Sequence, residues 1–383
     1  MKKIVVACAS FKGTLSSRDA GEAVARGLQR AKFETQVIAL ADGGEGLVEA
    51  LASQVLGASI IETSCRDPLQ NWHTAKFAML PKMKNGTPAT LAVIEMAASS
   101  GLGLVPQDKR DPKITTTLGV GDQILAALNH CGGELEILLG LGGSATNDGG
   151  AGMAQALGVR LLDRSGNELK PGGAALLDLA RIDLSNMASR ARRVPVTVAC
   201  DVRNPLCGPD GASNIFGAQK GGSPDDLALL DATLANFARI IAKDMGKDVA
   251  ELPGAGAAGG LGAGCLAFLN ATLKPGIELV LDALGFDDVL SNAALVITGE
   301  GMLDAQTLMG KAPAGVADRA LRRGLRCVAI GGGIERSHET ELKATFRCIE
   351  SLSDFAGSVG AAMAEPARWL ENMACEKSGQ WLE

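Results

Sequence analysis

The chain of 383 residues contains no tyrosine, three tryptophans and nine phenylalanines, so aromatic residues account for only 3% of it. It also lacks a long basic block, because its 37 Lys and Arg residues are outnumbered by 43 Asp and Glu residues, for a net charge of −6. Nucleic-acid sites combine clustered positive charge with aromatic faces on which bases stack. The composition therefore disfavours nucleic-acid binding.

The sequence also lacks a recognisable targeting or membrane-spanning segment. The apolar run at the amino terminus ends at Ser10, which is too early for a secretory signal and typical of a first β-strand. Residues 252–273 carry no charge, but their Gly and Pro content predicts a glycine-rich loop followed by a short buried helix. Nine cysteines without a C-x-x-C spacing predict reduced, mostly buried thiols and a cytoplasmic protein that does not contact a membrane.

The signatures of hydrolases and of histidine-ligated metal sites are missing as well. His73, His130 and His338 show no metal-ligand spacing. No Gly-x-Ser-x-Gly elbow is present, so hydrolysis by an activated serine is disfavoured.

Two common nucleotide motifs are incomplete. Gly310-Lys311 is followed by Ala312, so it does not form a Walker A loop. Residues 254–259 match the dinucleotide pattern G-x-G-x-x-G, but the segment before them, 251–253, reads Glu-Leu-Pro where the pattern requires a strand. A Rossmann NAD site is therefore disfavoured.

Glycine is abundant, with 49 residues, and the chain exceeds the length at which one hydrophobic core stops growing. Two α/β domains are therefore expected. Both chain ends alternate strands and helices in the manner of a parallel sheet, whereas the middle does not. We predict a discontinuous parallel-sheet domain, of Rossmann or flavodoxin-like type, from residues 1–68 and 291–383, and an inserted mixed-sheet α/β domain from residues 69–290.

The predicted elements of the two chain ends are strands at 4–9, 37–41, 294–298, 326–330 and 346–349, and helices from 17, over 47–56 and over 311–323. The middle is predicted to contain strands 76–80 and 90–96 joined at Asn85-Gly86, a second tight pair around 164–167, strands 135–139 and 194–200, and helices 117–129 and 223–245.

Every glycine cluster except that of residues 254–264 contains acidic or basic residues. Glycine-rich turns leave backbone N–H groups free to converge on an anion, and a helix that follows adds its dipole. Several such loops, together with Lys12, Lys220 and Lys311, predict a polyanionic ligand. For any single loop, the alternative is that glycine only supplies a turn.

The carboxylates are placed as metal-assisted phosphoryl transfer requires. Asp201 follows a buried strand and precedes the turn Asn204-Pro205, so it is a candidate base for a substrate hydroxyl. The structural alternative for Asp201 is a turn or helix cap. Further carboxylates in glycine loops that could hold Mg²⁺ against phosphates are Asp42, Glu45, Asp148, Glu300 and Asp304.

An ordered set of motifs resembles the type I family of glycerate kinases from residue 3 to about 320. The motifs lie at 10–13, 41–46, 142–150, 200–206, 216–221, 254–260, 275–278, 297–301 and 304–313. The resemblance implies two α/β domains with the active site in the cleft between them. It also implies ATP-dependent, Mg²⁺-assisted phosphorylation of D-glycerate to 2-phosphoglycerate; a homodimer is left open.

We assign roles to the motif residues on this basis. Catalysis is assigned to Asp201, Lys12 and Lys220, and metal binding to Glu300 and Asp304. Substrate or phosphate binding is assigned to Ser10, Asp42, Gly43, Gly44, Glu45, Gly142, Gly143, Ser144, Asn147, Asp148, Asn204, Gly256 and Lys311.

Two positions depart from the family pattern. Where the family has Pro-Asp-Ser-Phe-Lys, this sequence has Ala9 in place of the aspartate. Where the family has Gly-Glu-Gly-Arg, this sequence has Met302 in place of the arginine. These departures leave open an active variant that uses other groups, a kinase for another hydroxy or sugar acid, and a nucleotide-binding regulatory paralogue with impaired catalysis. Independently of them, a kinase that forms 3-phosphoglycerate also stays open.

Overall fold

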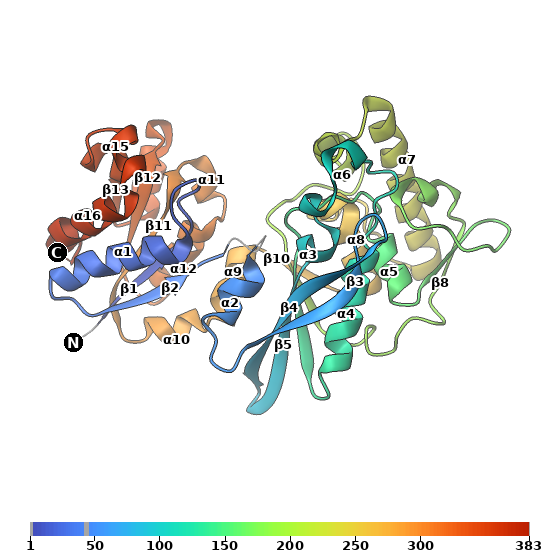
Figure 1. The fold of residues 1–383 in the computed structure, drawn as a ribbon, viewed down its shortest axis with the longest axis horizontal. Coiled ribbons are helices and arrows are strands. Elements are labelled where there is room, and N and C mark those ends of the chain that lie inside the picture. The colour runs from blue at the N-terminus through green and yellow to red at the C-terminus, as the bar shows by residue number, and fades with distance from the viewer. Residues whose placement is uncertain (1–2, 42–45, 383) are drawn as a thin grey trace. The chain divides into compact units, whose positions relative to one another are not determined.

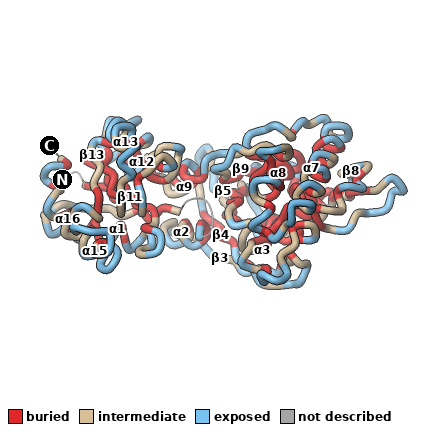
Figure 2. The backbone as a smooth tube through the Cα atoms, turned by 90° about the horizontal axis from the view of Figure 1, so that it is seen from above, coloured by how far each residue is buried: buried red, intermediate tan, exposed pale blue. Residues whose placement is uncertain are grey.

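The computed structural model describes residues 3–41 and 46–382, and the chain forms two compact units (Figure 1). Unit 1 comprises residues 1–42 and 277–383, and unit 2 comprises residues 43–276. Each unit has its own sheet with helices packed against it, which confirms the predicted α/β class. Buried residues follow the strands in both units, and exposed residues follow the loops and outer helix faces (Figure 2).

The sheet of unit 1 is entirely parallel, in the order β13-β12-β11-β1-β2. Strand β1 pairs on one side with β2 and on the other with the central strand β11, so Val6 lies between Val37 and Ile297. The two ends of the chain therefore build one sheet. The strands are β1 (Lys3–Cys8), β2 (Thr35–Ala39), β11 (Ala293–Leu303), β12 (Cys327–Ile334) and β13 (Cys348–Ser351).

Helices cover the unit 1 sheet. Alternate β1 residues Ile4, Val6 and Cys8 pack into one buried cluster with α1 and α16, as the two-residue period of a strand dictates. Helix α12 packs against β11 and β12. The helices are α1 (Ser17–Arg30), α9 (Gly276–Ala283), α10 (Phe286–Leu290), α11 (Ala305–Leu308), α12 (Ala312–Arg322), α13 (Glu339–Thr345), α14 (Leu352–Phe355), α15 (Val359–Ala364) and α16 (Pro366–Leu382).

Unit 2 contains a mixed sheet in the order β10-β9-β6-β5-β4-β3. Strand β4 pairs antiparallel with both β3 and β5, whereas the pairs β5–β6, β6–β9 and β9–β10 are parallel. Asn85 and Gly86, both with positive φ, form the predicted β4–β5 turn. The strands are β3 (Ser59–Arg66), β4 (Trp72–Lys84), β5 (Thr87–Glu95), β6 (Leu135–Gly140), β9 (Val196–Ala199) and β10 (Thr272–Lys274).

The predicted tight pair around residues 164–167 is confirmed only as a short antiparallel contact. Leu162 and Glu168 form a single antiparallel bridge across the turn, which Asp163 closes by accepting backbone hydrogen bonds from Ser165 and Asn167. The extended strand pairing is instead between β7 (Arg160–Leu162) and β8 (Arg181–Asp183).

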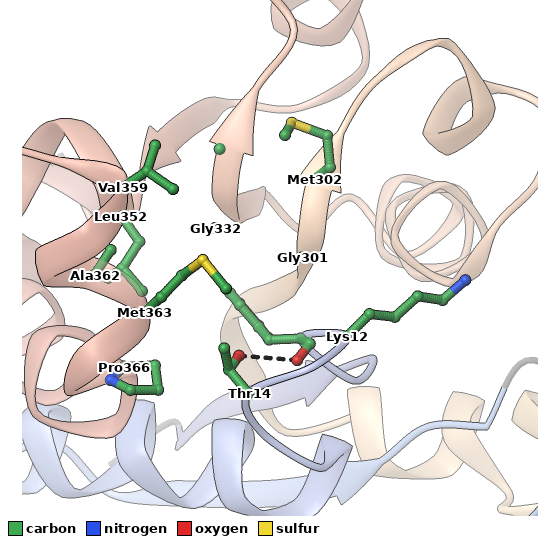
Figure 3. A pocket seen from close by; sticks show the side chains of 12 residues that line it. Lys12, Thr14, Gly301, Met302, Gly332, Leu352, Val359, Ala362, Met363 and Pro366 are labelled. Carbon is green, nitrogen blue, oxygen red and sulfur yellow. Dashed lines mark hydrogen bonds between the residues drawn. The ribbon is translucent and has the colours of Figure 1, made fainter.

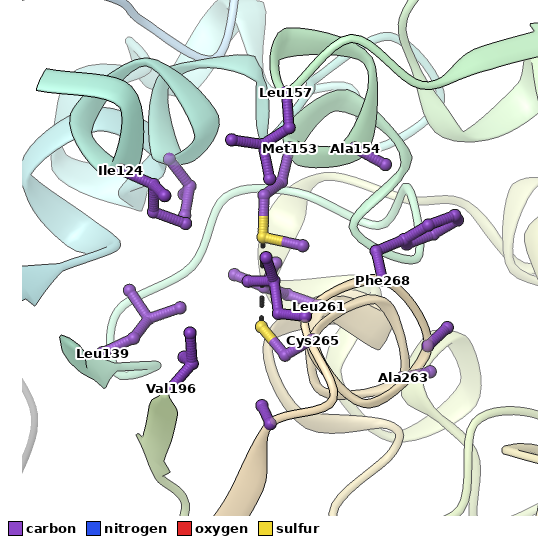
Figure 4. Packing of buried hydrophobic residues seen from close by; sticks show 14 of the residues in the cluster. Ile124, Leu139, Met153, Ala154, Leu157, Val196, Leu261, Ala263, Cys265 and Phe268 are labelled. Carbon is purple, nitrogen blue, oxygen red and sulfur yellow. Dashed lines mark hydrogen bonds between the residues drawn. The ribbon is translucent and has the colours of Figure 1, made fainter. Parts of the chain in front are cut away.

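The core of unit 2 lies between its sheet and helices, where residues such as Ile124, Met153, Leu261 and Phe268 pack together (Figure 4). Within residues 252–273, the predicted buried helix is confirmed as α8. The unit 2 helices are α2 (Leu47–Ala52), α3 (Ala97–Ser100), α4 (Leu118–His130), α5 (Ala151–Ala156), α6 (Ala212–Phe216), α7 (Pro224–Met245) and α8 (Ala257–Phe268).

All nine cysteines are free thiols, of which five are buried and four are partly buried. This confirms the expectation of reduced, mostly buried thiols. Across the described ranges 3–41 and 46–382, none of the helices has the length and apolar character needed to cross a membrane.

The unit limits at 42/43 and 276/277 differ from the expected limits at 68/69 and 290/291. The difference at the first limit arises because β3 pairs with β4 in the unit 2 sheet and α2 packs against β4 and β5. At the second limit, Arg319 on α12 forms ion pairs with Asp282 and Asp287, which ties the segment after residue 276 to unit 1.

Candidate active site

The strands of unit 2 end together at one edge of the sheet. Glu95 at the end of β5 is in register with Gly140 of β6, Gly140 with Ala199 of β9, and Ala199 with Lys274 of β10. The segments that follow these four strands therefore meet at the carboxyl edge, where ligands bind in α/β folds.

Asp201 lies at this edge and is exposed to solvent. Its Oδ1 accepts a hydrogen bond of 2.8 Å from the backbone N–H of Gly276, the first residue of α9. Asp201 thus caps the start of α9, as the structural alternative predicts. Its side chain is nevertheless exposed to solvent. Nearby, Asn204 donates from Nδ2 to the carbonyl oxygen of Asp210 (2.8 Å), and its own carbonyl accepts from Gly256 N–H (3.0 Å).

The loop after β6 has an accessible half and a buried half. Gly143 is exposed and in a left-handed conformation (φ 76°), and Gly142 and Ser144 on either side of it are partly exposed. The backbone of Ser100 to Leu102 fixes this half, since Leu102 N–H donates to Gly143 and Ala145 N–H donates to Ser100. The accessible half is therefore a backbone surface that an anion can approach.

The buried half is organised around Asp148, which has no exposed surface. Its carboxylate accepts hydrogen bonds from the backbone N–H groups of Thr117, Gly150 and Gly152 and from the hydroxyls of Thr116 and Thr117. Burial raises the pKa of Asp148, and these hydrogen bonds oppose the rise. Asp148 holds the loop from inside and does not face solvent.

Lys220 and Asn147 lie in the same interior. Lys220 is 1% exposed, and its Nζ donates to the carbonyl oxygen of Thr146 (2.7 Å). Burial lowers the pKa of Lys220 to about 7, although the charge of Asp148 favours the protonated form. Asn147 donates to the hydroxyl of Ser213. Lys220 and Asn147 therefore stabilise the loop from inside. Their burial does not match the direct ligand contacts that the sequence analysis assigned to them.

Three glycines of the 254–264 segment, Gly259, Gly260 and Gly264, pack against this same loop, whereas Gly256 packs against the backbone of Pro205. Gly259 (φ 68°) accepts the N–H of Gly149, and a Cβ at position 259 would lie 1.9 Å from the carbonyl oxygen of Thr146. No strand precedes this cluster, so its glycines serve the close approach of two backbones.

Glu95 was not among the residues selected from the sequence. It is 7% exposed, and its Oε1 accepts a 2.7 Å hydrogen bond from Val48 N–H at the start of α2. Burial raises the pKa of Glu95, which the backbone N–H groups of residues 46–48 oppose. An acid that ends an otherwise apolar strand was the available signal. Asp42, Gly43, Gly44 and Glu45 lie outside the described residues.

In unit 1, Ser10 and Lys12 follow β1 and lie beside β11. Ser10 is half-buried and Lys12 is exposed. A Cβ at position 301 would lie 3.2 Å from the backbone nitrogen of Lys12, so the two segments are adjacent. The predicted strand over 294–298 ends too early, because residues 299–303 extend β11 and pair with residues 330–334 of β12.

Glu300 and Asp304 are linked through Thr307. The Thr307 hydroxyl donates to Glu300 Oε1 (2.6 Å), and Asp304 Oδ1 caps α11 by accepting from the N–H groups of Gln306 and Thr307. Lys311 is the residue that precedes α12. Within residues 3–41 and 46–382 there is no group of three or more His, Cys, Asp or Glu arranged to hold a metal ion.

Parallel strands that carry glycine loops, a lysine and carboxylates at their ends define an α/β enzyme that handles phosphate groups. The profile of the glycerate kinase family matches residues 4–381. The chain therefore belongs to the glycerate kinase family and is a kinase.

Individual relatives agree with this assignment. Glycerate kinase from Bacillus subtilis (strain 168) is 46% identical over 374 residues, covering 97% of this chain and 96% of that protein. Glycerate 2-kinase from Escherichia coli (strain K12) is 42% identical and covers 97% of each chain. A crystal structure provisionally named as glycerate kinase 2 from Salmonella typhimurium LT2 has a TM-score of 0.84 at 40% identity and covers 99% of both chains.

Proposed function

We propose that this protein transfers the γ-phosphoryl group of ATP to the 2-hydroxyl of D-glycerate, with Mg²⁺, to give 2-phosphoglycerate. Family membership supports the reaction class, and the name of the Escherichia coli relative supports the 2-position. The observation that carries the proposal is the carboxyl edge of unit 2, where accessible Asp201 and the accessible backbone of Gly142 to Ser144 end neighbouring strands.

Asp201 is suited to accept the proton of the substrate hydroxyl. Its hydrogen bond to Gly276 N–H orients the carboxylate, and its exposure allows an acceptor to approach. As the hydroxyl proton passes to Asp201, the hydroxyl oxygen forms a bond to the γ-phosphorus and ADP leaves. Lys12 and the N–H groups of Gly142 to Ser144 offset phosphate and carboxylate charge.

The described residues fit a magnesium ion held mainly by phosphates. Mg²⁺ in kinases usually takes one or two carboxylates, with phosphate and water oxygens completing its shell. Glu300 and Asp304 offer carboxylates, although both also accept hydrogen bonds within unit 1. The ion would neutralise charge on the transferring phosphoryl group.

The direct test is purified protein with D-glycerate, ATP and Mg²⁺, followed by ADP detection and phosphorus NMR of the product. We expect glycerate-dependent ADP and a 2-phosphoglycerate signal. A 3-phosphoglycerate signal would refute the position, and turnover only with another hydroxy or sugar acid would refute the substrate. ATP binding by calorimetry without any turnover would instead favour the regulatory paralogue suggested by Ala9 and Met302.

A further inference from the structure

A cavity of about 170 Å³ lies in unit 1 at the carboxyl ends of β1, β11 and β12 (Figure 3). None of the residues around it is among those placed in the reaction except Lys12. Its lining comes from the segment after β1, from β11 and β12, and from the helices that follow β13: Phe11, Lys12, Thr14, Gly301, Met302, Gly332, Gly333, Leu352, Val359, Ala362, Met363 and Pro366.

The cavity is lined mainly by apolar side chains. Met302 lies on one side and Val359 on the other, while Met363 extends from α15 toward the segment of Lys12 and Thr14 (Figure 3). Three of the apolar side chains are unusually open to solvent, at 49% for Met302, 57% for Met363 and 63% for Val359. Exposed apolar side chains gathered around a hollow mark a ligand site. Thioether groups favour aromatic rings.

Glycines of two strands, β11 and β12, line part of the cavity. Gly332 has no side chain to fill it, and a Cβ at this position would lie 2.5 Å from the carbonyl oxygen of Gly301. A Cβ at Gly333 would lie 3.2 Å from the Met302 sulfur. Side chains at these positions would collide with β11, so this part of the cavity wall is bare backbone.

Charge is confined to one side of the cavity. Among its lining residues, all of which the structure describes, Lys12 is the single charged one. The hydroxyl of Thr14 donates to the carbonyl oxygen of Phe11, so it is engaged within the loop. The Lys12 side chain extends away from the apolar side chains (Figure 3). The apolar part of the cavity therefore borders on the positive charge of Lys12.

We propose that this pocket receives the purine base of the nucleotide donor, with the phosphates leading toward Lys12. The inference rests on the proposed kinase function, and it adds that the nucleotide base binds in unit 1. The cavity is smaller than the roughly 300 Å³ at which sites for drug-sized ligands begin, so it suits one ring system and not a whole nucleotide. Glycerate bears polar oxygen on every carbon and does not match an apolar lining.

Met363→Ser tests the proposal, with Leu321→Ser as a matched control. Both residues lie on helices of unit 1 and are 57% exposed, but Leu321 does not line the pocket. We expect Met363→Ser to raise the KM for ATP roughly tenfold through loss of an apolar contact with the ring, and to leave the KM for glycerate within about twofold. Leu321→Ser should change neither constant.

Binding measurements separate this proposal from the proposed function. Calorimetry with ADP and with tripolyphosphate, both with Mg²⁺, requires no turnover. Weaker binding of ADP but unchanged binding of tripolyphosphate by Met363→Ser supports a base pocket even if glycerate is not phosphorylated. Unchanged ADP binding, equal weakening of both ligands, or a rise in the glycerate KM alone would overturn it.

Discussion

At the scale of single residues, Asp201→Asn removes the proposed base and should leave the fold intact. An asparagine keeps an oxygen for the Gly276 N–H but cannot take up a proton at neutral pH. We therefore expect Asp201→Asn to lower kcat by roughly 100-fold or more, with the melting temperature nearly unchanged. Steady-state kinetics and thermal unfolding measure both quantities.

The control is Asp163→Asn, which makes the same exchange in an exposed turn of unit 2. Asp163 also accepts backbone N–H hydrogen bonds, from Ser165 and Asn167, but lies in the turn that follows β7. The kcat of Asp163→Asn should stay within about twofold of the kcat of the natural protein. A normal kcat for Asp201→Asn would assign the base to another group.

Lys220 makes stability depend on pH. Its pKa is about 7 in the folded protein, below its ordinary 10.5 in the unfolded chain, because burial disfavours the charged form. Between these values the unfolded chain binds more protons, so the free energy of unfolding rises with pH, by at most about 1.4 kcal/mol per pH unit. Below pH 7 both states are protonated and the destabilisation is fully present.

Lys220→Met removes this titration, and the difference between the two proteins isolates it. Denaturant unfolding at pH 7, 8 and 9 should show the natural protein gaining stability relative to Lys220→Met as pH rises. Parallel profiles would show that Lys220 keeps its ordinary pKa in the folded state.

At the scale of elements, the contact between α1 and α16 holds the two ends of the chain together. Arg26 and Arg30 pair with Glu371 across it, and burial of Trp381 anchors the end of α16. A Cβ at Gly27 would lie 2.1 Å from the carbonyl oxygen of Glu371. The helices can therefore lie this close only because position 27 carries no side chain.

Gly27→Ala and Gly379→Ala should have effects of opposite sign. Alanine is favoured over glycine within a helix by about 1 kcal/mol. At position 379 of α16 a Cβ meets nothing within 4 Å, so Gly379→Ala should raise the denaturant midpoint. Overlap with the α16 backbone should make Gly27→Ala destabilising by roughly 1–3 kcal/mol. Stabilisation by both would mean that the helices separate without cost.

Elements with local signals could be predicted from the sequence. The Ser223–Asp226 capping box and Pro224 mark the start of α7, and Asn85-Gly86 marks the β4–β5 turn. Strand β3 escapes prediction because it is an exposed edge strand whose Ser, Thr and Glu residues weaken the apolar pattern.

The site was predictable only where chain position decides it. Asp201 follows a buried strand, so its place at a sheet edge could be inferred. The burial of Lys220 could not, because it depends on a contact with Thr146, which lies 74 positions away. The same holds for Gly259. Its contact with the backbone of Thr146 and Asn147, and not with a ligand, depends on tertiary structure alone.

At the scale of the whole molecule, the two units differ in how the chain builds them. Unit 2 is one continuous segment with its own sheet and buried core. We expect residues 46–276 expressed alone to unfold cooperatively, as followed by circular dichroism against urea. The matched fragment, residues 277–383, lacks β1 and β2 and should show no cooperative transition. A cooperative transition in that fragment, or none in 46–276, would contradict this view.

The pairing of β1 with β11 also sets an order of events on the ribosome. Lys3 finds its neighbour Ala293 only after the whole of unit 2 has been synthesised. Until then β1, α1 and β2 lack their central sheet partner and their α16 cover, and their apolar faces are open to other chains. The segment from β1 to β2 is thus the part of the nascent chain that we expect to need protection by chaperones for longest, until β11 and α16 have been translated.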